Sequence, residues 1–158
     1  MRRMPFLAIL ATSALALLAL TTGAAFASHQ AKTVTVSTRN VKGLGQVLVN
    51  AKDLTLYMFV PDKDSKVTCV KKCAEAWPPL FLPKGARAVA AGESKSSLLG
   101  TDADPAGGRV ITYAGCPLYT YVADTSPGAD TGQALKLNGG LWYALSPSGK
   151  VIKTKPKS

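Results

Sequence analysis

Apolar residues alternate with polar ones in short stretches from residue 32 onward. Alternation with a period of two, combined with β-branched and aromatic residues, is typical of a strand that buries one face. Residues 85–97 and 102–108 lack this pattern, and we expect a surface loop and a turn-rich connection there. The strands that the pattern predicts span residues 32–37, 46–50, 54–60, 109–113, 117–122 and 141–146.

One segment has a helical pattern instead. Cys69, Cys73 and Trp77 follow each other at intervals of four, which places them on one stripe of a helix. Thr68 is the expected N-cap, because threonine is preferred there. The helix is expected to end before Pro78, since the residue that precedes a proline avoids helical geometry. The predicted fold is therefore mainly β with one or two short helices.

The chain contains an internal repeat. The segment LYMFVPD at residues 56–62 returns as LYTYVAD at residues 118–124, and four of the seven positions are identical. Extended backwards without a gap, the match pairs Leu48 with Val110. Further along, Trp77 is matched by Trp142, both in the second half of their repeats. Because a repeat determines architecture, we expect two pseudo-symmetric antiparallel β repeats that form a single domain.

The expected organisation places this tandem domain at residues 43–149. Its first repeat covers about residues 43–82 and its second about residues 98–149. An N-terminal segment (28–42) precedes the domain, and a basic tail (150–158) follows it.

The first 27 residues have the pattern of a secretory signal peptide. Arg2 and Arg3 precede an apolar run over residues 6–20, and the small-x-small triplet 25–27 comes directly before Ser28. The run is shorter than the ~20 residues that span a bilayer, so we expect export with cleavage and no transmembrane segment in the mature protein. No cysteine lies at the cleavage region to accept a lipid. The expected location is periplasmic or extracellular, without a lipid anchor.

The mature protein is expected to be basic. The full chain has 19 lysines and arginines against nine acidic residues, a formal charge of +10, and loss of Arg2 and Arg3 with the signal lowers this to about +8. A basic exported protein is attracted to anionic polymers or lipid surfaces of the envelope. Solubility alone also explains the charge and is the favoured interpretation. No arginine-rich cluster with interleaved aromatic residues is present, so nucleic acid is not an expected partner.

The three cysteines leave more than one possibility open. In an oxidising compartment paired thiols usually form a disulfide, and the spacing favours a structural bridge between Cys69 and Cys73. Pairing of either with Cys116 is an alternative. A third possibility is that Cys69 and Cys73 bind copper or exchange electrons, because soft thiolates are ligands of Cu(I). Against copper, the lone histidine is His29, only one residue beyond Ser28.

The same scarcity of histidine argues against catalysis. Nucleophilic triads need a base that the fold positions. Asp62 and Asp124 form a possible carboxylate pair for glycoside hydrolysis. Each of them closes a repeated strand, where a carboxylate commonly accepts backbone N–H bonds. We therefore predict structural aspartates and no enzymatic activity.

The repeated aromatic residues share faces. In an extended strand Tyr57 and Phe59 point to one side, and Tyr119 and Tyr121 do the same in the second copy. If a pseudo-twofold relates the copies, the four rings line either one core or one exposed platform suited to a sugar or peptide. Core packing is the favoured interpretation.

Taken together, the motifs resemble a bacterial family of secreted repeats. Its members carry a Tyr-x-aromatic-x-x-Asp (Y-x4-D) element and are often described as predicted lipoproteins of unknown function. The resemblance covers most of residues 43–149 and rests on the motifs Tyr57-x4-Asp62, Cys69-x3-Cys73-Ala74, Trp77-Pro78-Pro79-Leu80, Thr112-Tyr113-Ala114-Gly115, Pro117-Leu118-Tyr119-x4-Asp124, Trp142-Tyr143 and Ser146-Pro147.

The resemblance implies an exported, envelope-associated protein but no settled activity. This chain departs from the lipoprotein pattern because it lacks the lipid-attachment cysteine, and Cys116 stands where relatives more usually have a polar or basic residue. Our hypothesis is an exported, non-catalytic envelope or extracellular protein with a binding or structural role and no cofactor. The alternative is a periplasmic redox or copper-handling protein that uses Cys69 and Cys73.

Overall fold

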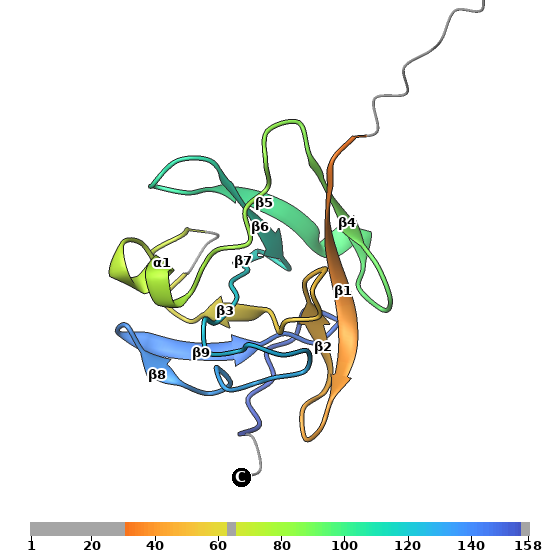
Figure 1. The fold of residues 1–158 in the computed structure, drawn as a ribbon, viewed down its shortest axis with the longest axis vertical. Helices are drawn as coiled ribbons and strands as arrows, with labels where there is room; N and C mark the ends of the chain where they lie inside the picture. The colour runs from red at the N-terminus through yellow and green to blue at the C-terminus, as the bar shows by residue number, and fades with distance from the viewer. Residues whose placement is uncertain (1–30, 63–65, 156–158) are drawn as a thin grey trace, which may run out of the picture.

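The computed structural model describes residues 31–62 and 66–155 (Figure 1). The predicted signal peptide, His29 and the last residues of the basic tail lie outside this part. The described chain is mainly β, as predicted. Its strands are β1 (Thr33–Val41), β2 (Gly45–Val49), β3 (Tyr57–Phe59), β4 (Arg87–Ala90), β5 (Leu99–Ala103), β6 (Arg109–Tyr113), β7 (Cys116–Pro117), β8 (Lys136–Leu137) and β9 (Gly140–Ala144), and its helices are α1 (Lys72–Ala76) and the 3-10 turn η2 (Ser96–Leu98).

The strands form three small sheets, in the orders β2-β1-β4, β3-β9-β8 and β5-β6-β7. The hairpin β1–β2 and the hairpin β5–β6 are equivalent elements of the two repeats. Thr38 pairs with Leu48 in the first hairpin, and Thr101 pairs with Ile111 in the second. The structural counterpart of Leu48 is therefore Ile111 and not Val110. The gapless match was wrong by one residue there because the connection from β2 to the motif is one residue longer in the first repeat.

The two repeats exchange strands. β3 of the first repeat pairs with β9 of the second, with Tyr57 opposite Ala144. In the reciprocal place, Tyr119 of the second repeat forms a bridge with Pro79 of the first, and the Thr120 N–H donates to the Pro78 carbonyl at 3.0 Å. Each motif strand thus pairs with the tryptophan-bearing segment of the other copy and not with that of its own.

The motif strands also meet each other at the pseudo-twofold. The Tyr57 N–H donates to the Tyr119 carbonyl at 2.8 Å, and the Tyr119 N–H donates to the Tyr57 carbonyl at 2.9 Å. Period-two alternation sends neighbouring side chains of β3 into different cores. Tyr57 and Phe59 enter an aromatic core, whereas Leu56 and Met58 enter an aliphatic core that also holds Leu118.

The helix is shorter than the sequence pattern indicated. α1 begins after Lys71, which has a positive φ of 54° and makes no side-chain cap. Thr68 is not the N-cap. Its backbone N–H and its hydroxyl both bond to the Asp62 carboxylate, at 2.8 and 2.6 Å. Both helices are short, and within the described residues neither has the length and apolar content needed to cross a bilayer.

The segment 85–97 is not simply a surface loop. It contains β4 and the start of η2, and β4 pairs in parallel with β1, with Thr33 opposite Arg87. This is the one parallel pair among the described strands, and the other strand pairs are antiparallel as predicted. Alanine-rich β4 has low intrinsic strand preference, and its conformation follows from the long edge that β1 offers. The strand expected over 117–122 is reduced to β7 and the bridges at Tyr119.

Candidate functional site

A stack of four aromatic rings occupies the centre of the molecule. Trp77 and Trp142 lie face to face, with ring centroids 3.8 Å apart and planes 2° from parallel. Tyr121 stacks on Trp77 at 4.1 Å, and Phe59 stacks on Trp142 at 4.2 Å. The stack therefore runs Phe59–Trp142–Trp77–Tyr121, and the pseudo-twofold passes between the two indoles.

Two further rings close the sides of the stack. Tyr57 meets Trp77 edge to face at 5.5 Å, and Tyr119 meets Trp142 in the same way at 5.3 Å. Edge-to-face and stacked contacts each add to the energy of burial. Both tryptophans and both of these tyrosines have no exposed surface. The rings therefore pack as a core, with a partly buried Tyr121 at one end of the stack, and do not form an accessible platform for a sugar or peptide.

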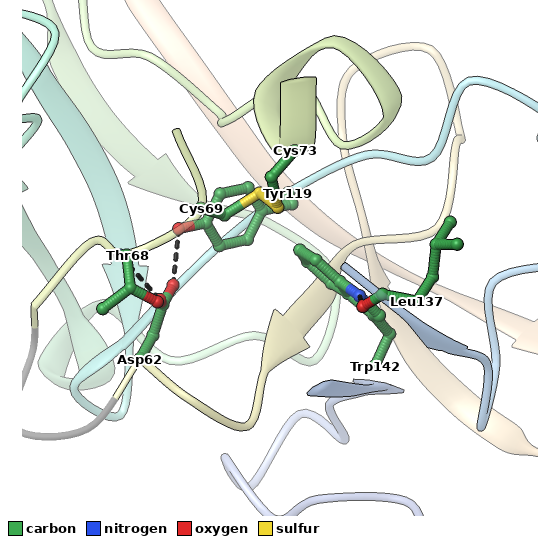
Figure 2. The surroundings of a disulfide bond; sticks show 7 residues. All are labelled: Asp62, Thr68, Cys69, Cys73, Tyr119, Leu137 and Trp142. Carbon is green, nitrogen blue, oxygen red and sulfur yellow. Dashed lines mark hydrogen bonds between the residues drawn. A yellow bond between two sulfur atoms is a disulfide. The ribbon is translucent and has the colours of Figure 1, made fainter. Parts of the chain in front are cut away.

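The motif carboxylates are exchanged between the copies. The Tyr57 hydroxyl donates to Asp124 Oδ2, and the Tyr119 hydroxyl donates to Asp62 Oδ2, each at 2.5 Å. The aspartate of each Y-x4-D element thus holds the tyrosine of the other repeat. Figure 2 shows the Tyr119 half of this arrangement, with the Asp62 carboxylate between the Tyr119 hydroxyl and Thr68.

The second oxygen of each carboxylate is also occupied. Asp62 Oδ1 accepts bonds from Thr68, and Asp124 Oδ1 accepts bonds from the N–H and hydroxyl of Thr131, at 3.0 and 2.5 Å. Sequence reasoning missed Thr131 altogether. A threonine six or seven residues after each motif aspartate was the available signal. Each carboxylate joins three groups and holds the strand end in place.

This geometry determines the protonation state of the two motif tyrosines. Burial, and after it the hydrogen bond to Asp124, raises the pKa of Tyr57 far above its usual value of 10.0. Burial and the bond to Asp62 raise the pKa of Tyr119 in the same way. Both phenols therefore stay neutral donors across the physiological range, because a phenolate beside a buried carboxylate is doubly unfavourable.

Cys69 and Cys73 form a disulfide with a Cα–Cα distance of 5.1 Å, the bridge that the spacing favoured. Figure 2 shows it beside Tyr119 and Trp142, and Cys69 is completely buried. The bridge attaches the start of α1 to the aromatic core. Cys116 is a free, half-buried thiol whose pKa is raised by burial and by the negative charge of Asp62.

No metal centre is evident in the described part of the chain. Within residues 31–62 and 66–155, no three His, Cys, Asp or Glu side chains gather closely enough to hold an ion. The predicted site residues do come together, but around the ring stack. The space around the stack is filled by these side chains, and their packing and hydrogen bonds stabilise the fold.

The surface carries an excess of positive charge. Among the described residues, every lysine is exposed, whereas Asp62, Asp104 and Asp124 are buried. One ion pair occurs in this part of the chain, between Arg39 and Asp53 at 2.9 Å. The described lysines therefore face solvent, and none of them forms an ion pair.

A comparison with family models identifies a relationship to known sequences. A family model described as a secreted repeat of unknown function matches residues 38–80 and again residues 100–146, together more than half of the chain. Each matched segment runs from within a first hairpin strand, through the motif, to beyond the tryptophan. None of the curated proteins and none of the solved structures matches the chain.

Proposed function

Because the chain belongs to the family of secreted repeats of unknown function, we propose that it is a non-catalytic exported protein that binds anionic polymers or lipid surfaces of the cell envelope. Its lysine-covered surface makes the attachment, and the duplicated core serves to hold that surface in shape. The secreted character of the family supports export.

The distribution of charge carries this proposal. In the described chain, exposed lysines and arginines outnumber the acidic residues that reach the surface, and Asp62, Asp104 and Asp124 are buried. A surface with an excess of positive charge creates a field that attracts anionic partners over about a Debye length. The exposed cations of the described chain lie on many elements: Lys32, Lys42, Lys52, Lys66, Lys71, Lys72, Lys84, Arg87, Lys95, Arg109, Lys136, Lys150, Lys153 and Lys155.

The bonding of the motif aspartates supports a role without catalysis. General acid–base chemistry needs a carboxyl group that reaches a substrate. Asp62 and Asp124 are buried, and both oxygens of each already accept bonds from tyrosine and threonine. A substrate would have to displace these bonds and the rings beside them.

Sedimentation with lipid vesicles tests the proposal. The mature protein is expected to co-sediment with vesicles of phosphatidylglycerol and phosphatidylcholine, and to stay in solution with phosphatidylcholine alone. Raising salt from about 0.01 M to about 1 M shortens the Debye length from ~30 Å to ~3 Å, and retention should disappear. Absence of retention on anionic vesicles at low salt would contradict the proposal.

Paired lysine variants separate charge from side-chain identity. Lys150→Glu with Lys155→Glu removes four positive charges in effect and should lower the salt concentration at which half of the protein is released. Lys150→Arg with Lys155→Arg keeps the charge and should behave as the parent does. Equal release of both variants would show that charge does not drive the association.

The copper-handling alternative requires the Cys69–Cys73 bridge to open. Cu(I) binds thiolates, and the observation that favours this alternative is the partial exposure of Cys73. A stoichiometric Cu(I) complex formed under mild reductant would support it. A bridge that resists mild reductant in the folded protein would exclude it.

A further inference from the structure

An apolar groove lies on the face of the β3–β9 pair that turns away from the ring stack, at the margin of the aliphatic core. Tyr57 and Phe59 of β3 face the ring stack, so alternation turns Met58 and Val60 to the other side. In β9 the same rule turns Leu141 and Tyr143 to that side. The strands are held in register there, with Met58 opposite Tyr143 and the Val60 N–H donating to the Leu141 carbonyl at 3.0 Å.

Two adjoining cavities make up the groove. One has a volume of about 510 Å³ and is bordered by Pro61 and the glycines of the β8–β9 turn. The other has a volume of about 370 Å³ and is bordered by Met58, Tyr143 and Val151. Both are lined by Val60 and Leu141, so they are neighbours along the β3–β9 pair. Each volume falls within the ~300–1,000 Å³ typical of small-molecule sites.

Two charged residues of the described chain line the groove, and both are lysines. Lys136 lines the first cavity and Lys153 lines the second, and among the described residues that border either cavity no aspartate or glutamate occurs. Val60 keeps 39% of its surface exposed, and Leu137 next to Lys136 keeps 37%. An aliphatic floor with an ammonium group on each cavity matches a ligand with an apolar chain and a negative group.

The groove exists because the two repeats differ at this place. Val122 is the counterpart of Val60. The Val122 N–H donates to the Ala76 carbonyl at 3.1 Å, and the Val60 N–H donates in the same way to the Leu141 carbonyl. Ala76 ends the disulfide-linked helix α1, whereas Leu141 belongs to the β8–β9 hairpin. The hairpin approaches β3 closely at Gly140, where an added Cβ would lie 2.5 Å from Pro61 Cδ.

We propose that this groove binds a single-chain anionic amphiphile of the fatty-acid type. The acyl chain would lie along Val60 and Leu141, and the carboxylate would meet Lys136 or Lys153. The lining favours an acyl chain because its side chains are mostly aliphatic, and it favours an anion because its cations face no acidic residue. This site goes beyond the proposed envelope association and does not depend on it.

Calorimetric titration of the mature protein with sodium dodecanoate, below its micelle concentration, tests the site. We expect saturable binding of one dodecanoate per protein. Acetate, which has the head group alone, and dodecyltrimethylammonium, which has the chain with a positive head, should not bind measurably. Absence of saturable dodecanoate binding, or equal binding of the cationic amphiphile, would overturn the proposal.

Matched variants locate the binding. Val60→Asp places a carboxylate in the groove and should abolish dodecanoate binding, whereas Val122→Asp, the same change at the counterpart in the other repeat, should leave it intact. Near-ultraviolet circular dichroism checks that both variants are folded. Loss of binding in both variants, or in neither, would refute the location.

The head-group contact has its own pair of variants. Lys136→Ala with Lys153→Ala should weaken dodecanoate binding about tenfold or more, the effect of losing a charge-assisted contact. Lys42→Ala with Lys150→Ala removes the same charge elsewhere and should not. Equal weakening by both pairs would mean that overall charge acts and not the groove. If vesicle retention fails while dodecanoate binding follows this pattern, the envelope proposal alone is wrong.

Discussion

Strong alkali is expected to unfold this protein through two buried tyrosines. Tyr57 and Tyr119 have raised pKa values in the folded state, because they are buried and bonded to carboxylates. In the unfolded chain each phenol ionises with a pKa of about 10. Below pH 10 both states keep the proton, and the stabilising contribution is fully present. Above pH 10 the unfolded state loses protons that the folded state retains, so stability falls as pH rises.

The size of the effect follows from linkage. At pH 11, ionisation of the unfolded state favours unfolding by about 1.4 kcal/mol for each tyrosine, hence by about 3 kcal/mol for the pair. A domain of this size typically has an unfolding free energy of about 5–15 kcal/mol. The pair therefore removes a large share of the stability within one pH unit, and more above it.

Urea unfolding between pH 8 and pH 11.5, followed by tryptophan fluorescence, measures this loss. Both tryptophans of the chain lie in the stack, so the signal reports its opening. Tyr57→Phe should lower the unfolding free energy at pH 8 by about 1.5–3 kcal/mol, because a bond to a buried carboxylate is lost. Above pH 10 the unfolding free energy should fall with pH, and we call this dependence the alkaline slope. Tyr57→Phe should halve the part of the alkaline slope that the two buried tyrosines cause, and the double change with Tyr119→Phe should remove that part.

The matched control is Tyr121→Phe, which gives the second repeat the ring that Phe59 supplies in the first. It should keep the parent slope. Lysine titration contributes equally to all variants and cancels in their differences. A double variant that retains the full alkaline slope would refute the assignment of that slope to the exchanged tyrosine–aspartate bonds.

Four further outcomes are expected. Trp142→Ala should lower the unfolding free energy by about 3–5 kcal/mol in thermal denaturation, since it removes the middle of the stack; a loss below about 1 kcal/mol would contradict the packing. Alkylation and intact mass without reductant should show one free thiol, Cys116, in the native protein, and three reactive thiols in the native state would disprove the bridge. Gly140→Ala should lower stability by about 1–3 kcal/mol through overpacking against Pro61, and an unchanged melting temperature would mean that the hairpin can shift. Halves 28–92 and 93–158 should each lack a near-ultraviolet dichroism signal and regain it when mixed, because the strands are exchanged; a folded half would rule that exchange out.

Alternation and repetition in the sequence predicted several strands and the shared face of the motif aromatics. They located β6 at its observed bounds and β2 within one residue, and they placed Tyr57 with Phe59 on a shared face. These inferences succeed because burial of one face is a local property of a strand. The same pattern did not predict β4, because the conformation of β4 depends on the neighbouring edge of β1 and not on its own residues.

The exchange of strand pairs and tyrosine–aspartate bonds between the repeats could not be predicted from the sequence for a different reason. Similarity between two segments shows that they adopt the same conformation, but it does not show whether each pairs within its own copy or with the other. Asp62 is five residues from Tyr57, yet it binds Tyr119. Thr68 was assigned to a helix cap because a threonine hydroxyl satisfies a free helix N–H and a carboxylate equally well. Only the three-dimensional positions decide between these partners.

The symmetry of the core indicates where a specific function resides. Rings, carboxylates and threonines obey the pseudo-twofold. The stacked rings and the tyrosine–aspartate bonds join the two copies, so a change in one repeat disturbs both. The segments between each threonine and the following tryptophan do not follow the pseudo-twofold. One became α1 with its disulfide, and the other became the β8–β9 hairpin that borders the groove at Val60 and Leu141. A ligand that distinguishes one side of this molecule from the other must therefore bind where the copies differ, and the groove is such a place.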